Sequence, residues 1–148
     1  RIETLAGGGL PSAQTLSVNY QHRPADVPDT GTGTHSWRIR RLRFLDSVPA
    51  VLEDIWLDAA RASNLDVSML PESLYHFYQS QLGFWISRTE DSVGVGAVPD
   101  WAPARFGLEP ASPCGVVDRI AWAQDATPVE YSRSWFNPAI ARYVARLI

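Results

Sequence analysis

Polar and apolar residues alternate along several stretches of this chain. In residues 13–20, Thr15 and Ser17 alternate with Leu16 and Val18, which is the two-residue period of a strand with one buried face. The same pattern predicts further strands at residues 36–46, 49–57, 85–98, 115–124 and 127–136. The first two of these form one predicted hairpin and the last two form a second, because only a short turn separates the strands of each pair.

Helical segments are expected between the strands. Pro71 and Glu72 suit the first turn of a helix that runs to about Leu82 and ends at Gly83. This helix carries an apolar stripe at helical spacing, made of Leu74, Phe77, Tyr78 and Leu82. Further helical segments are expected in residues 1–10 (a last turn ending at the glycines), 58–64 (or an irregular turn), 99–108 and from Asn137 onward.

Strands joined mostly by hairpins, with helices inserted at intervals, indicate an α+β fold. We expect a mainly antiparallel sheet flanked by helices that cover one face. The 148 residues are enough for one domain with its own core. Residues 23–35 are rich in Pro, Gly, Asp and Thr and are predicted to form a loop.

Charge and composition exclude several classes of function. The net charge of −3 argues against nucleic-acid binding by this chain alone, since phosphate binding needs a basic face. No apolar run approaches the ~18–20 residues that span a bilayer, and the first residues show no signal-peptide pattern. The single cysteine, Cys114, excludes an internal disulfide and fits a reducing, cytoplasmic compartment.

Motifs for metal binding and catalysis are missing from the sequence. His22, His35 and His76 are scattered and form no HxH or HExxH pair, so we expect neither a metal site nor a cofactor. The glycines at 7–9 lack the frame of a phosphate-binding loop. No GxSxG elbow is present for nucleophilic catalysis.

The first hairpin contains the densest cationic cluster of the chain. Arg41 and Arg43 share one strand face, which we expect to look inward. Glu53 on the return strand lies opposite Arg41 if the loop has an odd number of residues. Because a guanidinium group binds carboxylate or phosphate at two points, this face predicts a site for an anionic or polar small ligand. The alternative is that these arginines are surface residues in weak ion pairs.

Arg38 and Arg40 alternate with that pair and fall on the other face of the same strand. We interpret them as surface residues that pair with Asp46 or Asp54.

Glu130 lies in an otherwise apolar strand, PVEYSRSWF, and shares a face with Ser132, Ser134 and Phe136. An inward carboxylate beside hydroxyl groups could hydrogen-bond a sugar-like or amine-bearing ligand. The alternative is an ion pair with an arginine of the same hairpin, Arg119 or Arg133.

Four segments taken in order resemble one known family. They are RLRFLDSVPAVLEDIWL, PESLYHFYQSQLG, ISRTEDSVGV and CGVVDRIAWAQDATPVEYSRSWF. The ordered set resembles the UTRA domain, the effector-binding domain of GntR-type transcription regulators of the HutC subfamily, from about Glu3 to Tyr143. This resemblance implies a chorismate lyase-like fold, with a mainly antiparallel sheet flanked by helices, that is usually dimeric.

The resemblance places a ligand site on six residues of this chain: Arg41, Arg43, Glu53, Ser73, Glu130 and Phe136. In phosphosugar-sensing members, the positions of Arg41 and Arg43 grip the anionic group. Ser73 falls at the start of the S-L-Y helix, where its hydroxyl can face an anion. Phe136 stands where sugar-binding members often carry Tyr, and residues 27–33 replace what is commonly a helix, so the effector and the pocket rim are expected to differ.

The function implied is a small-molecule effector-sensing and dimerisation domain of a bacterial transcription regulator, without enzyme activity. Its effector would be anionic or zwitterionic. DNA would be bound only by a winged-helix domain N-terminal to Arg1, which is absent from this chain. Two alternatives stay open: a chorismate lyase-like enzyme acting on a small carboxylate, and a structural dimerisation module with an emptied pocket.

Overall fold

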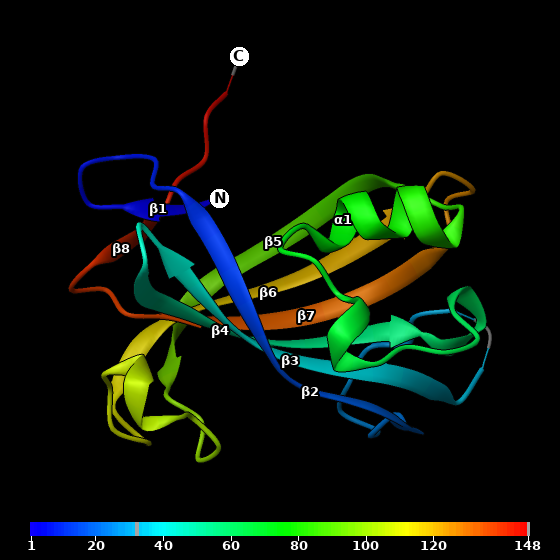
Figure 1. Ribbon diagram of the computed structural model, residues 1–148, viewed down its shortest axis with the longest axis horizontal. Helices are drawn as coiled ribbons and strands as arrows, with labels where there is room; N and C mark the ends of the chain where they lie inside the picture. Colours follow the sequence, from blue (N-terminus) through cyan, green and yellow to red (C-terminus); the bar gives the residue numbers. More distant parts are fainter. Residues whose placement is uncertain (32, 148) are drawn as a thin grey trace.

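A six-stranded antiparallel sheet forms the body of the domain in the computed structural model, which describes residues 1–31 and 33–147 (Figure 1). The strand order is β2-β3-β4-β7-β6-β5, and every neighbouring pair runs antiparallel. In chain order the strands are β2 (Pro11–His22), β3 (His35–Leu45), β4 (Val48–Asp58), β5 (Ile86–Ala97), β6 (Pro113–Ala123) and β7 (Pro128–Phe136). The predicted α+β fold with a mainly antiparallel sheet is confirmed.

The helices are fewer and shorter than the sequence predicts. Helix α1 (Leu74–Phe77) continues as a π-helical turn (Tyr78–Leu82) and ends at Gly83, whose φ of 77° is left-handed. A glycine reaches that conformation at little cost, which explains why the helix stops there. In the described residues, the remaining helical segments are single 3₁₀ turns at Ala59–Arg61, Val67–Met69 and Ala104–Phe106. The helix expected over residues 99–108 is therefore reduced to one turn.

A short strand lies near each end of the chain, and the two helices predicted there were wrong. Strand β1 (Ile2–Thr4) pairs antiparallel with β8 (Ala141–Tyr143) as a separate two-stranded ribbon. Asn137 does cap a turn as predicted, since its side chain accepts a hydrogen bond from the amide of Ala139 at 3.0 Å. Only one turn follows before the chain enters β8, which pairs with β1. Such pairing, between the two ends of the chain, leaves no trace in the local pattern.

The two faces of the sheet carry separate apolar cores. On one face, Ile39 and Ile55 pack with Leu74 and Phe77 of α1. On the other face, Leu42 and Leu52 pack with residues of the segment that follows β5, chiefly Val98 and Phe106. Figure 1 shows α1 and that segment on opposite sides of the strands. Alternating residues of β3 and β4 thus point into different cores, as the strand period requires.

The register of the β3–β4 hairpin depends on one irregularity. Its loop has two residues, Asp46 and Ser47, both with positive φ, the backbone of a tight hairpin turn. An even loop alone would place Leu52 opposite Arg41, but a bulge beside Arg43 shifts the register by one residue. Glu53 therefore lies directly opposite Arg41, as the sequence predicted for an odd loop.

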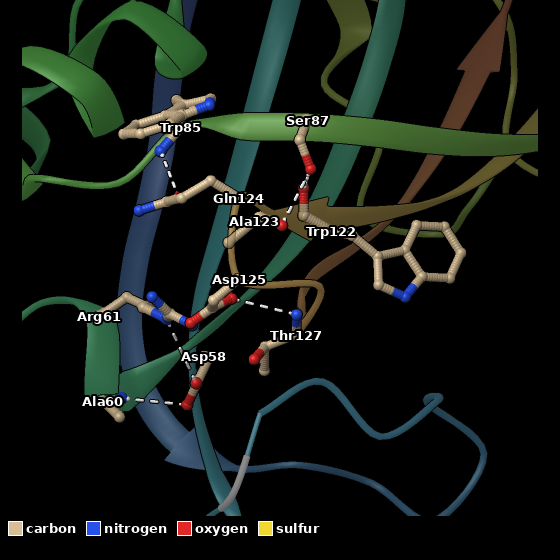
Figure 2. Close-up of polar contacts among 10 residues, drawn as sticks. All are labelled: Asp58, Ala60, Arg61, Trp85, Ser87, Trp122, Ala123, Gln124, Asp125 and Thr127. Carbon is tan, nitrogen blue, oxygen red and sulfur yellow. Dashed lines mark hydrogen bonds and ion pairs between the residues drawn. The ribbon is translucent and has the colours of Figure 1, made fainter.

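An arginine ties the end of β4 to the turn between β6 and β7. Figure 2 shows Arg61 between the carboxylates of Asp58 and Asp125. Its Nη2 donates to Oδ2 of Asp125 at 3.1 Å, and its Nε lies 4.0 Å from Oδ2 of Asp58. The guanidinium group also lies over the ring of Phe84, 5.4 Å from its centroid. These contacts join the end of β4 to the β6–β7 turn beside Phe84, a residue of the core on the α1 face.

Candidate functional site

A cavity of about 400 Å³ lies on the α1 face of the sheet. Its floor comes from the end of β3 and from the middle of the neighbouring strands β4, β7 and β6. Ser73 and Tyr75, at the start of α1, form one side, and the β1–β8 ribbon contributes Ile2 and Tyr143 to another. The volume suits a small ligand, because binding cavities of this kind typically range over about 300–1,000 Å³.

Arg43 reaches the cavity wall and is paired there with acidic side chains. Its Nη2 donates to Oε1 of Glu72 at 2.6 Å, and its Nη1 lies 3.8 Å from Oε1 of Glu53. The Arg43 side chain is about a quarter exposed, so this charge can be reached from the cavity.

Arg41 lies deeper and serves a different purpose. It is 1% exposed and does not appear among the described residues that line the cavity. Its Nη2 donates to the carbonyl oxygens of Pro71 at 2.9 Å and Glu72 at 3.0 Å. Burial lowers the pKa of this guanidinium group, which the neighbouring Glu53 carboxylate partly offsets. Arg41 thus fixes the backbone that leads into α1.

Glu53 lines the cavity between the two arginines of β3. Its Oε1 is buried and has no hydrogen-bond partner in the described part of the chain. A buried carboxylate oxygen without a donor costs free energy on the order of 1–3 kcal/mol. The nearest cation to this oxygen is Nη1 of Arg43, 3.8 Å away.

Glu130 is the most strongly perturbed acid of the cavity wall. It is 3% exposed, and the hydroxyl of Tyr78 donates a hydrogen bond to its Oε2. Burial raises the pKa of Glu130 to about 7; the Tyr78 hydrogen bond lowers it, and the charge of Glu53 raises it. The Glu130 carboxyl group therefore changes protonation near neutral pH. Neither arginine proposed as its partner pairs with it, because Arg119 binds Asp91 and Arg133 binds Asp118.

The hydroxyl groups predicted beside Glu130 also reach this wall. Ser132 and Ser134 of β7 line the cavity, together with Ser73. The hydroxyl of Ser73 also caps α1 by accepting from the amide of His76 at 3.3 Å.

A second polar cluster on the cavity wall was missed by sequence reasoning. Arg119 of β6 donates through Nε and Nη2 to both oxygens of Asp91, at 2.6 and 2.9 Å. The hydroxyl of Tyr143 donates to the same carboxylate at 2.6 Å, and Nη1 of Arg119 lies 3.4 Å from the hydroxyl of Tyr75. The hydrogen bond from Arg119 lowers the pKa of Asp91. The pairing of β5 with β6 brings Asp91 opposite Arg119, and the long connection between these strands hides that register from the sequence.

Phe136 is not among the described residues that line the cavity, but it packs directly beside it. It is 7% exposed and packs in a neighbouring core with Val51, Val117 and Ala141. A β-carbon on Gly115 would overlap its ring, so the β6 backbone runs directly against the aromatic face. Of the six predicted ligand residues, four line the cavity: Arg43, Glu53, Ser73 and Glu130. Arg41 lies behind them and Phe136 beside them.

The arginines on the other face of β3 form ion pairs, as expected. Nε and Nη2 of Arg38 donate to the two oxygens of Asp54 at 2.9 and 2.7 Å, and Arg40 lies 3.7 Å from the same carboxylate. Each guanidinium group also stacks on a tryptophan ring, Trp56 and Trp101 respectively. These arginines therefore belong to the sheet face opposite the cavity.

Two further observations concern the described residues only. They contain no group of three or more His, Cys, Asp or Glu side chains placed to hold a metal ion. None of their helices combines the length and the apolar character that crossing a membrane requires.

An antiparallel sheet with a short helix on one face, and between them a ligand-sized cavity lined by charged, hydroxyl and apolar side chains, indicates the class of small-molecule-binding domains. The UTRA domain family model matches residues 8–141, so the chain belongs to the UTRA domain family, the effector-binding domains of GntR-family transcription regulators. The predicted family resemblance is confirmed.

Known proteins agree with this assignment. The chain is 44% identical over 147 residues to the HTH-type transcriptional regulator SmoD of Agrobacterium fabrum, covering 99% of this chain and 63% of that protein. It is 25% identical over 130 residues to the mannosyl-D-glycerate transport/metabolism system repressor MngR of Escherichia coli, covering 86% and 50%. The chain thus spans less than two thirds of either relative.

A solved structure has the same fold. The ligand-binding domain of a GntR-family regulator from Bordetella bronchiseptica superposes with a TM-score of 0.87 at 22% identity, covering 100% of this chain and 96% of that one. The chorismate lyase-like fold expected from the sequence is confirmed by this similarity.

Proposed function

We propose that this domain binds a small polar effector in the α1-face cavity and thereby controls DNA binding by a regulator of the HutC subfamily. The observation that carries this proposal is the cavity itself, because guanidinium, carboxyl and hydroxyl groups converge on one ligand-sized volume. Binding would shift the regulator between two states that differ in DNA affinity. The domain would not act as an enzyme, in keeping with relatives that are regulators.

The rest of the regulator is inferred from its relatives. SmoD is named an HTH-type regulator, so we propose that a winged-helix domain precedes residue 1 and makes the DNA contacts. Strand β1 would then connect that domain to the cavity wall through Ile2. A regulator that works on bacterial DNA would act in the cytoplasm.

The effector is proposed to be a hydroxyl-rich molecule with an acidic or zwitterionic group. Arg43 and Arg119 present guanidinium groups at the wall, and Ser132 and Ser134 present hydroxyl groups. Glu53 and Glu130 add carboxyl groups to the same wall, and carboxylate oxygens accept hydrogen bonds from hydroxyl or amine groups. The name of MngR refers to mannosyl-D-glycerate, a compound that combines sugar hydroxyls with a carboxylate.

A homodimer is proposed through the edge strand β5. This strand pairs with β6 on one side only, and its Val93 and Val95 are 53% and 85% exposed. Long exposed apolar edge strands pair readily with a second strand. Sedimentation velocity should show a dimer that Val95→Asp weakens, and an unchanged dimer in that variant would place the interface elsewhere.

The function can be tested by a thermal-shift screen of phosphorylated sugars, sugar acids, amino-acid derivatives and aromatic acids. A ligand that binds only the folded state raises the melting temperature with its concentration. We expect at least one class to stabilise the domain, and Arg43→Ala to reduce that stabilisation while Arg38→Ala, on the other face of β3, leaves it intact. Equal stabilisation of all three proteins would show that the cavity is not the binding site.

A further inference from the structure

The cationic group of the β3 cavity wall is already occupied by a carboxylate of the same chain. Glu72 Oε1 lies 2.6 Å from Nη2 of Arg43, within the distance of a charge-assisted hydrogen bond. Both side chains line the cavity. An acidic group that enters the cavity therefore meets a guanidinium group whose charge is balanced from within.

The backbone of this segment is held independently of the Glu72 side chain. Arg41 donates to the carbonyl oxygens of Pro71 and Glu72, and it does so from a fully buried position. The Glu72 side chain itself is 37% exposed. It can therefore rotate away from Arg43 into solvent without moving the chain that leads into α1.

The second acidic neighbour of Arg43 has no such freedom. Glu53 lies on the central strand β4, its side chain is 16% exposed, and its Oε1 lies 3.8 Å from Nη1 of Arg43. It remains beside Arg43 whatever the position of Glu72. Of these two carboxylates, only that of Glu72 can be exchanged for a ligand group.

From these contacts we infer that Glu72 is an internal competitor for Arg43, so that an acidic effector group binds only by displacing the Glu72 carboxylate. This inference rests on the proposed effector site and adds the residue that sets its selectivity for charge. A simple oxyanion gains little from the exchange, because it replaces one carboxylate by another group of like charge. An effector must add contacts elsewhere in the cavity, so Glu72 discriminates against small inorganic anions.

The experiment is an NMR titration with sodium sulfate, at constant ionic strength set by sodium chloride. Sulfate serves as the probe because it carries the oxyanion without the hydroxyl groups of an effector. The variants are Glu72→Gln, which removes the competing charge, and Glu72→Asp, which keeps the charge on a shorter arm. Glu90→Gln is the matched control, since Glu90 is an exposed acid that lies 3.7 Å from Arg88 on β5.

We expect Glu72→Gln to bind sulfate about tenfold more tightly than the wild-type domain, the scale of one charge-assisted hydrogen bond. The shifts should centre on Arg43, Glu72→Asp should show a smaller gain, and Glu90→Gln should behave as wild type. Adding Arg43→Gln to Glu72→Gln should abolish the gain. The backbone spectrum of each variant reports directly on its fold.

Three results would overturn the inference: no gain in Glu72→Gln, an equal gain in Glu90→Gln, or a gain that survives in the double variant. If sulfate binds none of the proteins, Glu72→Gln shows no gain, and this result also overturns the inference. Each of these outcomes leaves the effector site itself untouched, because that proposal is tested separately by stabilisation with organic ligands.

Discussion

Replacing Glu130 by Gln should change the pH dependence of stability in a defined direction. Glu130 has an ordinary pKa of 4.5, and burial raises it to about 7 in the folded domain. Between these two pH values, the folded state therefore keeps a proton on Glu130 that the unfolded state has already released. Stability from this group is greatest at low pH and falls as pH rises through that interval, because charging a buried carboxyl group costs free energy.

The size of the effect follows from the same two values. A tenfold change in proton affinity is worth about 1.4 kcal/mol, so the interval corresponds to about 3 kcal/mol of lost stability above neutral pH. Glutamine keeps an oxygen that can accept from Tyr78 and carries no charge. The variant should exceed the stability of the wild-type domain by less than about 1 kcal/mol at pH ~5 and by about 3 kcal/mol at pH ~8.

The assay is urea unfolding of both proteins at intervals from pH 5 to 8.5. The difference between their free energies of unfolding isolates Glu130, since the other groups titrate in both proteins. The groups that act on Glu130 are Tyr78, Glu53, Arg119 and Arg41, and all stay in place. A difference that does not vary with pH would refute the account of a buried acid that titrates near neutral pH.

Three further substitutions test the division of labour around the cavity. Arg43→Ala should weaken effector binding by about 1.5–3 kcal/mol in calorimetry, with Arg38→Ala unchanged; equal loss in both would contradict the site. Arg41→Ala should lower stability by about 1–3 kcal/mol, because it leaves the carbonyl oxygens of Pro71 and Glu72 without their donor, and a fully stable variant would remove its anchoring role. Gly115→Ala should lower the free energy of unfolding by about 1–3 kcal/mol, because the new methyl group overpacks the ring of Phe136. Gly94→Ala should lower it much less, since nothing lies within 4 Å of its new methyl group. Equal losses in urea unfolding would refute the packing argument.

The sheet and half of the site could be predicted because they depend on local pattern. Strand alternation and turn residues determine the two hairpins. Within the first hairpin, that alternation places Arg43 and Glu53 on the cavity face. Glu130 was predicted in the same way, as a carboxylate on an inward strand face, and it lies on the cavity wall.

What sequence reasoning missed depends on contacts between distant segments. The β1–β8 ribbon pairs Ile2 with Tyr143, so two apparent helix signals gave way to a strand pair. The Arg119–Asp91 pair requires the register of two strands joined by a long connection. Arg41, predicted as a ligand residue, is buried behind the cavity wall, and its Nη2 donates to two carbonyl oxygens of the segment leading into α1.

The central claim is that occupancy of this cavity controls DNA binding, and operator binding by the full-length regulator tests it most directly. DNA affinity would be measured with and without the effector found in the thermal-shift screen. By thermodynamic linkage, the factor by which the effector changes DNA affinity should equal the factor by which DNA changes effector affinity. We expect the Arg43→Ala regulator to need more effector for the same change in DNA affinity, in proportion to its weaker effector binding. Its DNA affinity without effector should equal that of the wild-type regulator. An effector that binds the cavity with full affinity and leaves DNA binding unchanged would contradict the account.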